Sequence, residues 1–294
     1  MMIKLENVSY VYMAGGPFEK KALDGVSLEI SEGEFIGLIG HTGSGKSTLI
    51  QLLNGLLKPS GGKVYIDGED LTDKKTKLRD VRFKVGLVMQ YPEYQLFEET
   101  VIKDISFGPK NMGLDEKEVL ERAKFAANMV GLKEDTLDKS PFDLSGGQKR
   151  RAAIAGVLAM EPKILILDEP TAGLDPAGRN EILYKLRDMH KRMNLTVILV
   201  SHSMEDVAQL ADRILVMNHG KVEMFAPPSE IFRQSGRLRE IGLAVPQITN
   251  VMDMLKDAGL DVPDGIYTPD DAFEALRPFF YGRQNSSQRL RRIT

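Results

Sequence analysis

The residues best suited to chemistry begin with a glycine-rich run that ends in a lysine and two hydroxyl side chains. This run fits the pattern G-x-x-x-x-G-K-[ST] between a predicted buried strand at 35–39 and helical spacing over 46–57. Glycines let backbone N–H groups converge on phosphate oxygens, and a helix N-terminus adds unpaired donors and positive dipole. We therefore predict a nucleoside triphosphate site, with Lys46 reaching the β- and γ-phosphates and Ser47 offering its hydroxyl to Mg²⁺. The run reads Gly40-His41-Thr42-Gly43-Ser44-Gly45-Lys46-Ser47-Thr48.

Two adjacent carboxylates follow a second apolar run. Residues 164–167 are all Ile or Leu, and Asp168 and Glu169 come directly after them. Carboxylates at the end of a buried strand need a cation or a water network. We predict that Asp168 contacts Mg²⁺ through water. Glu169 is placed to polarise an attacking water, which makes it the candidate general base.

A second glycine-containing segment starts 98 residues after Lys46 and precedes a helical run at 149–160. Ser145 is a predicted helix N-cap, and the two glycines after it leave backbone amides bare. The segment has no lysine of its own. One nucleotide cannot readily use two such sites of one chain, so we predict a head-to-tail dimer in which this segment closes over the partner's nucleotide. The segment reads Leu144-Ser145-Gly146-Gly147-Gln148.

These motifs, in this order, resemble those of the ATP-binding subunits of ABC transporters, and the resemblance covers roughly residues 2–225. It implies ATP and Mg²⁺ as ligands. It also implies that Gln90 links Mg²⁺ to the transporter partner, and that His202 is a switch histidine that contacts the γ-phosphate. Asp175 lies in a loop that would cross the dimer interface.

The resemblance also gives Tyr12 a role, that of stacking on the adenine. Tyr10 and Phe18 are alternatives for this position, and a packing role for Tyr12 stays open.

Three further segments resemble energy-coupling factor (ECF) transporter ATPases. They are the aromatic loop 90–101, residues 140–143 before the Leu144–Gln148 segment, and residues 148–151 at its end. Residues 169–176 and the tail after Pro227 resemble the A′-type member of that family's ATPase pair.

The aromatic loop departs from the family pattern in one residue, because it has Tyr91 where Phe is more usual. Tyr91, Tyr94 and Phe97 are candidates for a groove that receives a helix of a membrane subunit. Ordinary core packing is the alternative for these three aromatic residues.

The elements that must position these residues alternate between strands and helices. Predicted strands at 3–12, 22–30 and 64–66 suit an antiparallel unit, whereas apolar runs at 35–39, 83–89, 163–167 and 195–200 suit a parallel sheet. Predicted N-caps at Asp115 and Asp175 begin helices, and Asn218-His219-Gly220 predicts a hairpin. With the resemblance, we expect an α/β P-loop NTPase with a RecA-like parallel core, an antiparallel β subdomain, a helical signature subdomain and a small C-terminal helical extension.

Composition excludes several classes of protein. The 294 residues carry 39 Lys and Arg against 42 Asp and Glu, so no basic excess favours nucleic acid, and we expect none as a partner. No cysteine is present, which excludes a disulfide scaffold, a thiolate metal site and a catalytic thiol. No apolar run approaches the ~18 residues of a membrane span. Attachment to a membrane would therefore need a partner.

The motifs divide the chain into a cassette at 1–225, with a helical subdomain at about 92–160, and an extension at 226–294. Nine basic and nine acidic residues balance in the extension, which we expect to support dimerisation or regulation. A helix is predicted from Thr268 to Phe280. The arginines at 283, 289, 291 and 292 predict a solvated, frayed tail or else a contact with a membrane surface or a partner.

The resemblance implies an ATPase that powers an ECF-type importer of a vitamin or a transition-metal ion. Its partners would be an A-type ATPase in a heterodimer, a transmembrane coupling subunit and a substrate-capture membrane subunit. Its place would be the cytoplasmic face of the cell membrane, as a peripheral protein. The alternatives are another class of ABC importer, with the tail as a ligand sensor, and a soluble ABC ATPase of DNA repair or translation. A single copy of each motif and the lack of a sustained heptad run disfavour the soluble ATPase.

Overall fold

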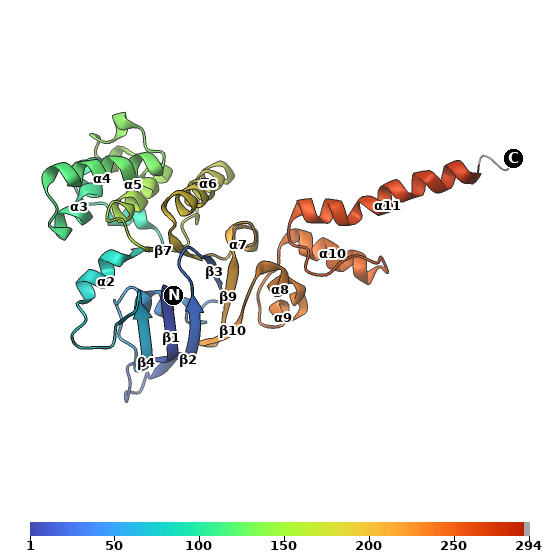
Figure 1. The fold of residues 1–294 in the computed structure, drawn as a ribbon, viewed down its shortest axis with the longest axis horizontal. Helices are drawn as coiled ribbons and strands as arrows, with labels where there is room; N and C mark the ends of the chain where they lie inside the picture. The colour runs from blue at the N-terminus through green and yellow to red at the C-terminus, as the bar shows by residue number, and fades with distance from the viewer. Residues whose placement is uncertain (291–294) are drawn as a thin grey trace.

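Two sheets form the body of the molecule in this computed structural model, which describes residues 1–290 and side chains as far as Phe280 (Figure 1). The larger sheet has the order β10-β9-β3-β8-β7-β6, and the smaller one has the order β2-β1-β4-β5. The strands are β1 (Ile3–Tyr12), β2 (Lys20–Ile30), β3 (Phe35–Ile39), β4 (Gly61–Ile66), β5 (Glu69–Asp70), β6 (Val85–Val88), β7 (Ile164–Asp168), β8 (Thr196–Val200), β9 (Arg213–Asn218) and β10 (Lys221–Ala226).

The larger sheet is parallel from β9 to β6, and only β10 joins it in antiparallel fashion. Every residue of β3 and β8 is buried, which explains why their sequences are almost wholly apolar. Because carboxyl ends of parallel strands meet at one edge of a sheet, the loops after β3, β6, β7 and β8 lie near one another. The smaller sheet is antiparallel throughout, as predicted.

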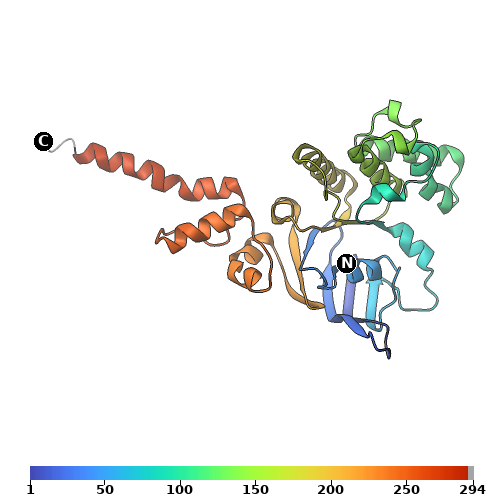
Figure 2. The ribbon, with the colours of Figure 1, turned by 180° about the vertical axis from the view of Figure 1, so that it is seen from behind.

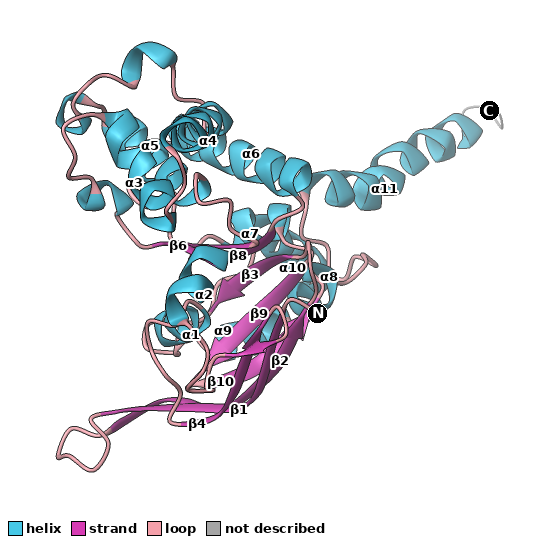
Figure 3. Cartoon of the chain, turned by 60° about the vertical axis from the view of Figure 1, so that its left-hand side comes forward, coloured by secondary structure: helices cyan, strands magenta, loops and turns pink. Residues whose placement is uncertain are grey.

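Three of the helices form a separate group. Figures 1 and 3 show α3, α4 and α5 packed together on the far side of the parallel sheet from β1, β2 and β4. The helices are α1 (Lys46–Leu53), α2 (Leu78–Lys84), α3 (Val101–Met112), α4 (Glu116–Met129), α5 (Gly146–Leu158), α6 (Pro176–Met193), α7 (Met204–Leu210), α8 (Pro228–Arg233), α9 (Ser235–Glu240), α10 (Gln247–Asp257) and α11 (Pro269–Leu290), with 3₁₀ turns η1 (Pro92–Gln95), η2 (Glu134–Thr136) and η3 (Pro141–Asp143).

The C-terminal helices project from the β10 edge of the body, as the views from the front and from behind show (Figures 1 and 2). Phe232 of α8 and Leu238 of α9 are buried in one apolar cluster with Val207 of α7 and Val216 of β9. Helices α8 and α9 are therefore anchored to the body. Beyond them, a smaller apolar cluster centred on Met252 belongs to α10, α11 and the chain between them.

The predicted fold is confirmed, and so are its main helix starts. The side chains of Asp115, Ser145 and Asp175 each accept a hydrogen bond from a backbone N–H in the first turn of the following helix. Several boundaries differ from the prediction by a few residues, and two of them have a clear local reason. The strand predicted from Phe83 begins at Val85, because α2 occupies the preceding residues. Helix α1 ends at Leu53, where the backbone turns out of the helix.

Helix α11 begins where the sequence predicts it, because Thr268 Oγ1 accepts from the backbone N–H of Asp271 at 3.2 Å. It continues to Leu290, beyond the predicted end at Phe280. Of the predicted arginine-rich tail, Arg291 and Arg292 lie outside the described residues, as do the side chains at 283 and 289. Within residues 1–290, no helix is long and apolar enough to cross a bilayer.

Candidate nucleotide-binding site

A cavity of about 430 Å³ lies at the carboxyl edge of the parallel sheet. Most of the residues predicted to bind ATP line it, although they come from five separate segments. Lys20 and Ala22 of β2 and Val200 of β8 also line it, and the sequence analysis did not single them out. The full lining is Tyr12, Lys20, Ala22, Thr42, Gly43, Gly45, Lys46, Ser47, Thr48, Gln90, Asp168, Glu169, Val200 and His202.

The glycines of the loop after β3 are required by the space around them. Gly45 has φ +105°, and a Cβ added there would lie 2.7 Å from the carbonyl oxygen of Ala22. A Cβ on Gly40 would lie 2.5 Å from the carbonyl oxygen of Met217. Gly43 has φ +82° and nothing within 4 Å of its Cβ position, so its side of the loop is open. The loop is thus closely backed by protein and open where a phosphate would approach.

Lys46 is the first residue of helix α1, and its side chain extends back over the loop 40–45 that precedes the helix. Its Nζ donates to the carbonyl oxygens of Gly40 at 2.6 Å and His41 at 3.2 Å. Burial lowers the pKa of the Lys46 ammonium, while the carboxylates of Glu169 and Asp168 raise it. The ammonium is therefore held as a buried cation between the loop and the two acids.

Three residues of the predicted loop stand behind the cavity. Gly40 and the fully buried Ser44 form the underside of the loop. The ring of His41 points away, with Nε2 3.2 Å from Oδ1 of Asn218 and its centroid 4.9 Å from that of His219. The His41 side chain thus packs against the β9–β10 hairpin.

Glu169 sits in a strained and poorly solvated position. It has φ +52°, which is uncommon for a residue with a side chain, and its backbone N–H donates to Val200 O at 3.0 Å. Burial raises the pKa of its carboxyl to about 7, the charge of Asp168 adds to this, and Lys46 opposes it. Within the described residues, Oε1 of Glu169 has no hydrogen-bond partner, and it lies 3.6 Å from Nε2 of His202. A proton acceptor with a pKa near neutrality thus faces the cavity.

The donors around Asp168 suit a hard cation. The Asp168 carboxylate, the Ser47 hydroxyl and the Gln90 amide all line the cavity. Burial raises the pKa of Asp168, and Lys46 opposes the shift. Oxygen donors with a single carboxylate fit Mg²⁺, which keeps several waters and takes further oxygens from phosphates. No group of three or more histidines, cysteines and acids that could hold a metal ion occurs within the described residues.

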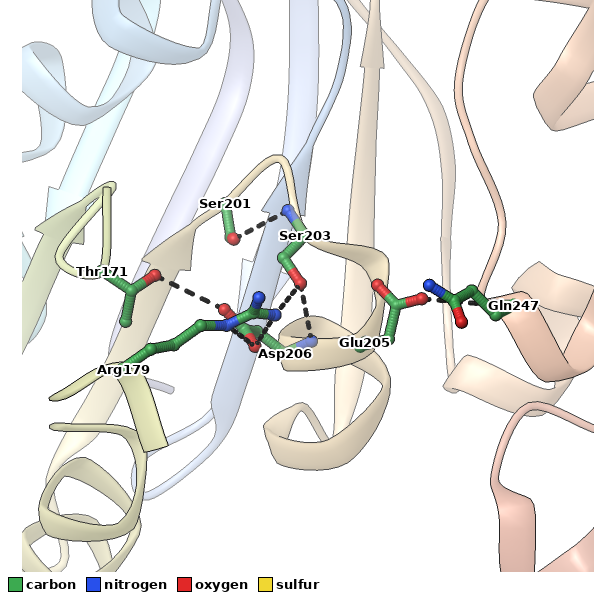
Figure 4. A network of polar contacts seen from close by, with 7 residues as sticks. All are labelled: Thr171, Arg179, Ser201, Ser203, Glu205, Asp206 and Gln247. Atoms are coloured by element: carbon green, nitrogen blue, oxygen red, sulfur yellow. Dashed lines mark hydrogen bonds and ion pairs between the residues drawn. The ribbon is translucent and has the colours of Figure 1, made fainter. Parts of the chain in front are cut away.

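A polar network fixes the loops that carry Glu169 and His202 (Figure 4). The Asp206 carboxylate, 4% exposed, accepts from Nε of Arg179 at 3.0 Å and from the Thr171 hydroxyl at 3.4 Å. The Ser203 hydroxyl accepts from Arg179 and from the backbone N–H of Asp206. Thr171 in the loop of Glu169 and Ser203 in the loop of His202 therefore both bond Asp206, and Arg179 binds Asp206 and Ser203 together.

The Leu144–Gln148 segment lies outside the cavity of its own chain. Ser145 accepts from the backbone N–H of Gln148, and the Gln148 side chain accepts from the N–H of Ser145, so the two form a reciprocal cap. A Cβ on Gly146 or Gly147 would meet nothing within 4 Å, and Asp175 is exposed as well. The segment thus presents an open helix N-terminus to whatever lies outside this chain.

An apolar groove of about 390 Å³ runs between α3, α5 and residues 95–97. Phe97 lines it and meets Phe107 edge to face, with 5.0 Å between ring centroids. Tyr91 and Tyr94 lie on or beside η1 and do not line the groove. The three aromatic side chains are 44%, 84% and 59% exposed in chain order, so core packing does not account for them.

Comparison with known proteins places this site in a family. The ABC transporter family matches residues 23–172. Proteins named energy-coupling factor transporter ATP-binding protein EcfA2 are similar over almost the whole chain. The one from Caldanaerobacter subterraneus is 58% identical, covering 97% of this chain and 100% of its own length. The one from Clostridium tetani is 60% identical, covering 95% and 98%.

Solved structures agree with these relatives. CbiO1 from Clostridium perfringens, described as part of the ABC transporter complex cbiONQ, is 40% identical with a TM-score of 0.73, over 86% of this chain and 98% of its own. The dimeric cassette MJ0796 in a post-hydrolysis state with ADP and Pi is 33% identical with a TM-score of 0.69, over 77% and 98%. The chain belongs to the energy-coupling factor transporter ATP-binding proteins and is an ATPase of the ABC family.

Proposed function

We propose that this chain is the A′-type subunit of an ECF importer, paired head to tail with an A-type ATPase. The observation that carries this proposal is the separation, within one chain, of the ATP cavity from the exposed, capped Leu144–Gln148 segment. Each nucleotide would then lie between the cavity of one subunit and this segment of the other. The names of the relatives, and the complex to which cbiO1 belongs, support transport as the purpose.

Hydrolysis would use Glu169 as the general base. The carboxylate takes a proton from water while the water oxygen bonds to the γ-phosphorus and the bond to the β–γ bridging oxygen breaks. ADP and inorganic phosphate leave, and the proton passes from Glu169 to solvent. Lys46 and His202 stabilise the negative charge on the transferred group. When bound by Ser47, Gln90 and Asp168, Mg²⁺ supplies charge neutralisation at the phosphates.

Nucleotide binding would draw on both sheets. The backbone of residues 40–48 would surround the phosphates, and the Tyr12 ring would stack on the adenine. The Tyr12 hydroxyl lies 3.2 Å from Oγ1 of Thr48. The rings of Tyr10 and Tyr12 pack edge to face, with 4.7 Å between their centroids. Tyr12, rather than Tyr10 or Phe18, lines the cavity, which supports its role in adenine stacking.

The work of ATP would pass to membrane partners through the groove lined by Phe97. We propose a transmembrane coupling subunit there and a separate subunit that captures a vitamin or a transition-metal ion. The complex would sit at the cytoplasmic face of the cell membrane.

Residues 1–225 would form the cassette, with its helical part at about 92–160, and residues 226–294 would stabilise or regulate the dimer. Asp175 would lie at the dimer interface.

The test is to purify the tagged, full-length chain from its own cells in mild detergent and to identify the proteins that accompany it. We expect a second cassette, a multi-span subunit and a small membrane subunit, together with Mg²⁺-dependent hydrolysis of ATP. Recovery of a two-permease importer would favour another ABC importer class. Recovery without membrane proteins would favour a soluble ABC ATPase and would overturn the proposal.

A further inference from the structure

Arg150 is a buried cation near the carboxyl edge of the parallel sheet. The proposed steps of nucleotide binding and hydrolysis do not involve it. Its side chain is 3% exposed, although it lies in the first turns of α5. A guanidinium has five donors in a fixed, planar arrangement and stays charged under all ordinary conditions. A buried arginine must therefore be matched by acceptors of defined geometry.

The acceptors of Arg150 come from two distant parts of the chain. Nε and Nη2 donate to the two carboxylate oxygens of Glu93 at 3.2 and 2.8 Å, a bidentate pair. Nη1 donates to the backbone carbonyls of Pro170 at 3.1 Å and Ala172 at 2.6 Å. One side chain thus binds the turn directly after Glu169 and, at the same time, the η1 turn that follows Gln90.

The Pro170–Ala172 turn is where a small shift would matter most. The backbone N–H of Ala172 donates to the carbonyl of Glu169 at 3.1 Å, so the turn and the general base form one unit. Glu169 holds its φ of +52° only because its surroundings impose it. Arg150 bonds the backbone carbonyls on either side of Thr171, whereas Asp206 bonds the Thr171 hydroxyl, so the turn is held by two separate side chains.

The other end of the Arg150 contact leads to the groove. Glu93 is in η1, whose last residue, Gln95, lines the groove along with Phe97. Helix α5, which carries Arg150, lines it as well, through Ala152, Gly156 and their neighbours. Both protein elements that meet at the Arg150–Glu93 pair are therefore walls of the groove.

We propose that Arg150 is a positioning residue for hydrolysis, which fixes the turn after Glu169 to the groove wall so that the general base and the partner-facing surface move as one unit. The positioning role requires only that this chain hydrolyses ATP with Glu169 as the base. The link between the groove and a membrane partner rests on the proposed function. The hydrogen-bond acceptors of Arg150 do not line the ATP cavity, so we infer that it acts through the turn and not on ATP.

The experiment compares variants of the full-length chain in the co-purified complex. In every preparation the second ATPase subunit carries Gln in place of its glutamate equivalent to Glu169, so that only the site of this chain turns over. Arg150→Met removes the donors, Glu93→Gln removes the acceptor charge, and a third variant combines both. Arg122→Met is the matched control, because Arg122 is also mostly buried and pairs with Glu118 and Glu161 in the helical region. The measurements are kcat, the affinity for a fluorescent ATP analogue, and the thermal midpoint of unfolding.

We expect Arg150→Met to lower kcat by about 10- to 100-fold, because a small displacement of the Glu169 carboxylate from the attacking water is enough to slow the reaction this much. Nucleotide affinity should stay within about twofold of wild type. Glu93→Gln should lower kcat several-fold. The double variant should be no worse than Arg150→Met, as for residues acting through one contact. Arg122→Met should keep near-normal kcat.

Three results would overturn the proposal: unchanged kcat in Arg150→Met, equal losses of kcat and nucleotide affinity, or additive effects of the two single variants. If Arg150→Met unfolds, Arg150→Lys decides, because it keeps the charge but cannot satisfy Glu93 and both carbonyls at once. In that case a lowered kcat with an unchanged thermal midpoint supports positioning, and a normal kcat rejects it. A wild-type complex without membrane proteins would instead refute the proposed transport function, while the kcat comparison would still test Arg150.

Discussion

Nε2 of His202 lies 3.6 Å from Oε1 of Glu169, across the carboxyl ends of β7 and β8. The two residues meet because β7 and β8 are neighbours in register, with Asp168 opposite Val200. The histidine side chain is largely exposed, whereas the glutamate is mostly buried. The buried Glu169 carboxylate is thus suited to accept a proton, and the exposed His202 ring is suited to contact a phosphate bound in the cavity.

Glu169→Gln should abolish hydrolysis while ATP still binds. The amide keeps the size of the side chain and cannot take a proton from water, so kcat should fall by about 10²- to 10⁴-fold. The closed dimer should accumulate with ATP, because the step that removes its ligand is blocked. Single-turnover hydrolysis in the assembled complex and size-exclusion chromatography would check both.

The second subunit's site can continue to turn over, so its equivalent glutamate needs the same substitution. Near-normal hydrolysis by that doubly substituted complex would exclude Glu169 as the base.

Hydrolysis should rise with pH through about 7. The Glu169 carboxyl has its pKa raised to about 7 by burial and by Asp168, and only the ionised form is a base. The rate should therefore fall about tenfold for each pH unit below 7 and level off above it. Burial and the charge of Lys46 lower the pKa of His202 from its ordinary value of 6.5, so the rise at about 7 is assigned to Glu169 and not to this histidine.

A profile of kcat at saturating MgATP between pH 5.5 and 9 measures this dependence. The residual activity of the Glu169→Gln variant is the control, and it should lack the rise near pH 7. A wild-type rate that is flat from pH 6 to 8 would contradict a glutamate of raised pKa acting as the base.

Tyr12→Ala should weaken ATP binding, and Tyr12→Phe should leave it nearly intact. Stacking requires the ring, whereas the hydroxyl only contributes the contact with Thr48 at 3.2 Å. We expect a loss of about 2- to 12-fold in affinity for the alanine variant, from the ~0.5–1.5 kcal/mol typical of an aromatic contact. Fluorescent-nucleotide titration measures it, and Phe18→Ala, at a position outside the cavity lining, is the control. Equal losses for the Phe and Ala variants would mean that the ring does not stack.

Most chemistry-bearing residues could be predicted because each follows a buried strand. Asp168, Gln90 and His202 are reached by finding apolar runs and looking just past their ends, and parallel pairing brings those ends together. The caps at Ser145 and Asp175 were predictable for a similar reason, since capping depends on neighbours within one turn.

What escaped prediction depends on contacts between distant segments. Lys20 enters the cavity because it pairs with Tyr12 across a β1–β2 ladder whose register shifts three times, and no sequence pattern indicates such shifts. The His41 ring turns away because Asn218 and His219 arrive from a hairpin far along the chain. Tyr94 misses the groove because of the 3₁₀ turn at Pro92–Gln95, which follows Tyr91 in a left-handed conformation.

Arg179→Met should destabilise the fold and slow hydrolysis together. The substitution leaves the buried Asp206 carboxylate without its ion pair, which costs about 3–5 kcal/mol when both partners are buried. Arg179 is about a third exposed, so water replaces part of the interaction and we expect ~1–3 kcal/mol of unfolding free energy to be lost. kcat should fall several-fold as well, because Ser203, next to His202, loses the Arg179 donor.

Urea denaturation and ATPase assays on the same preparations check this, with Arg192→Met as the matched control. Arg192 lies on the same helix and pairs with Asp188 at 2.9 Å, but its side chain is 66% exposed. Its loss should change unfolding by less than about 0.5 kcal/mol and leave kcat unchanged. Similar losses of stability in the two variants would mean that the Arg179–Asp206 pair is an ordinary surface contact. In that case this pair would contribute little to holding the loops of Glu169 and His202.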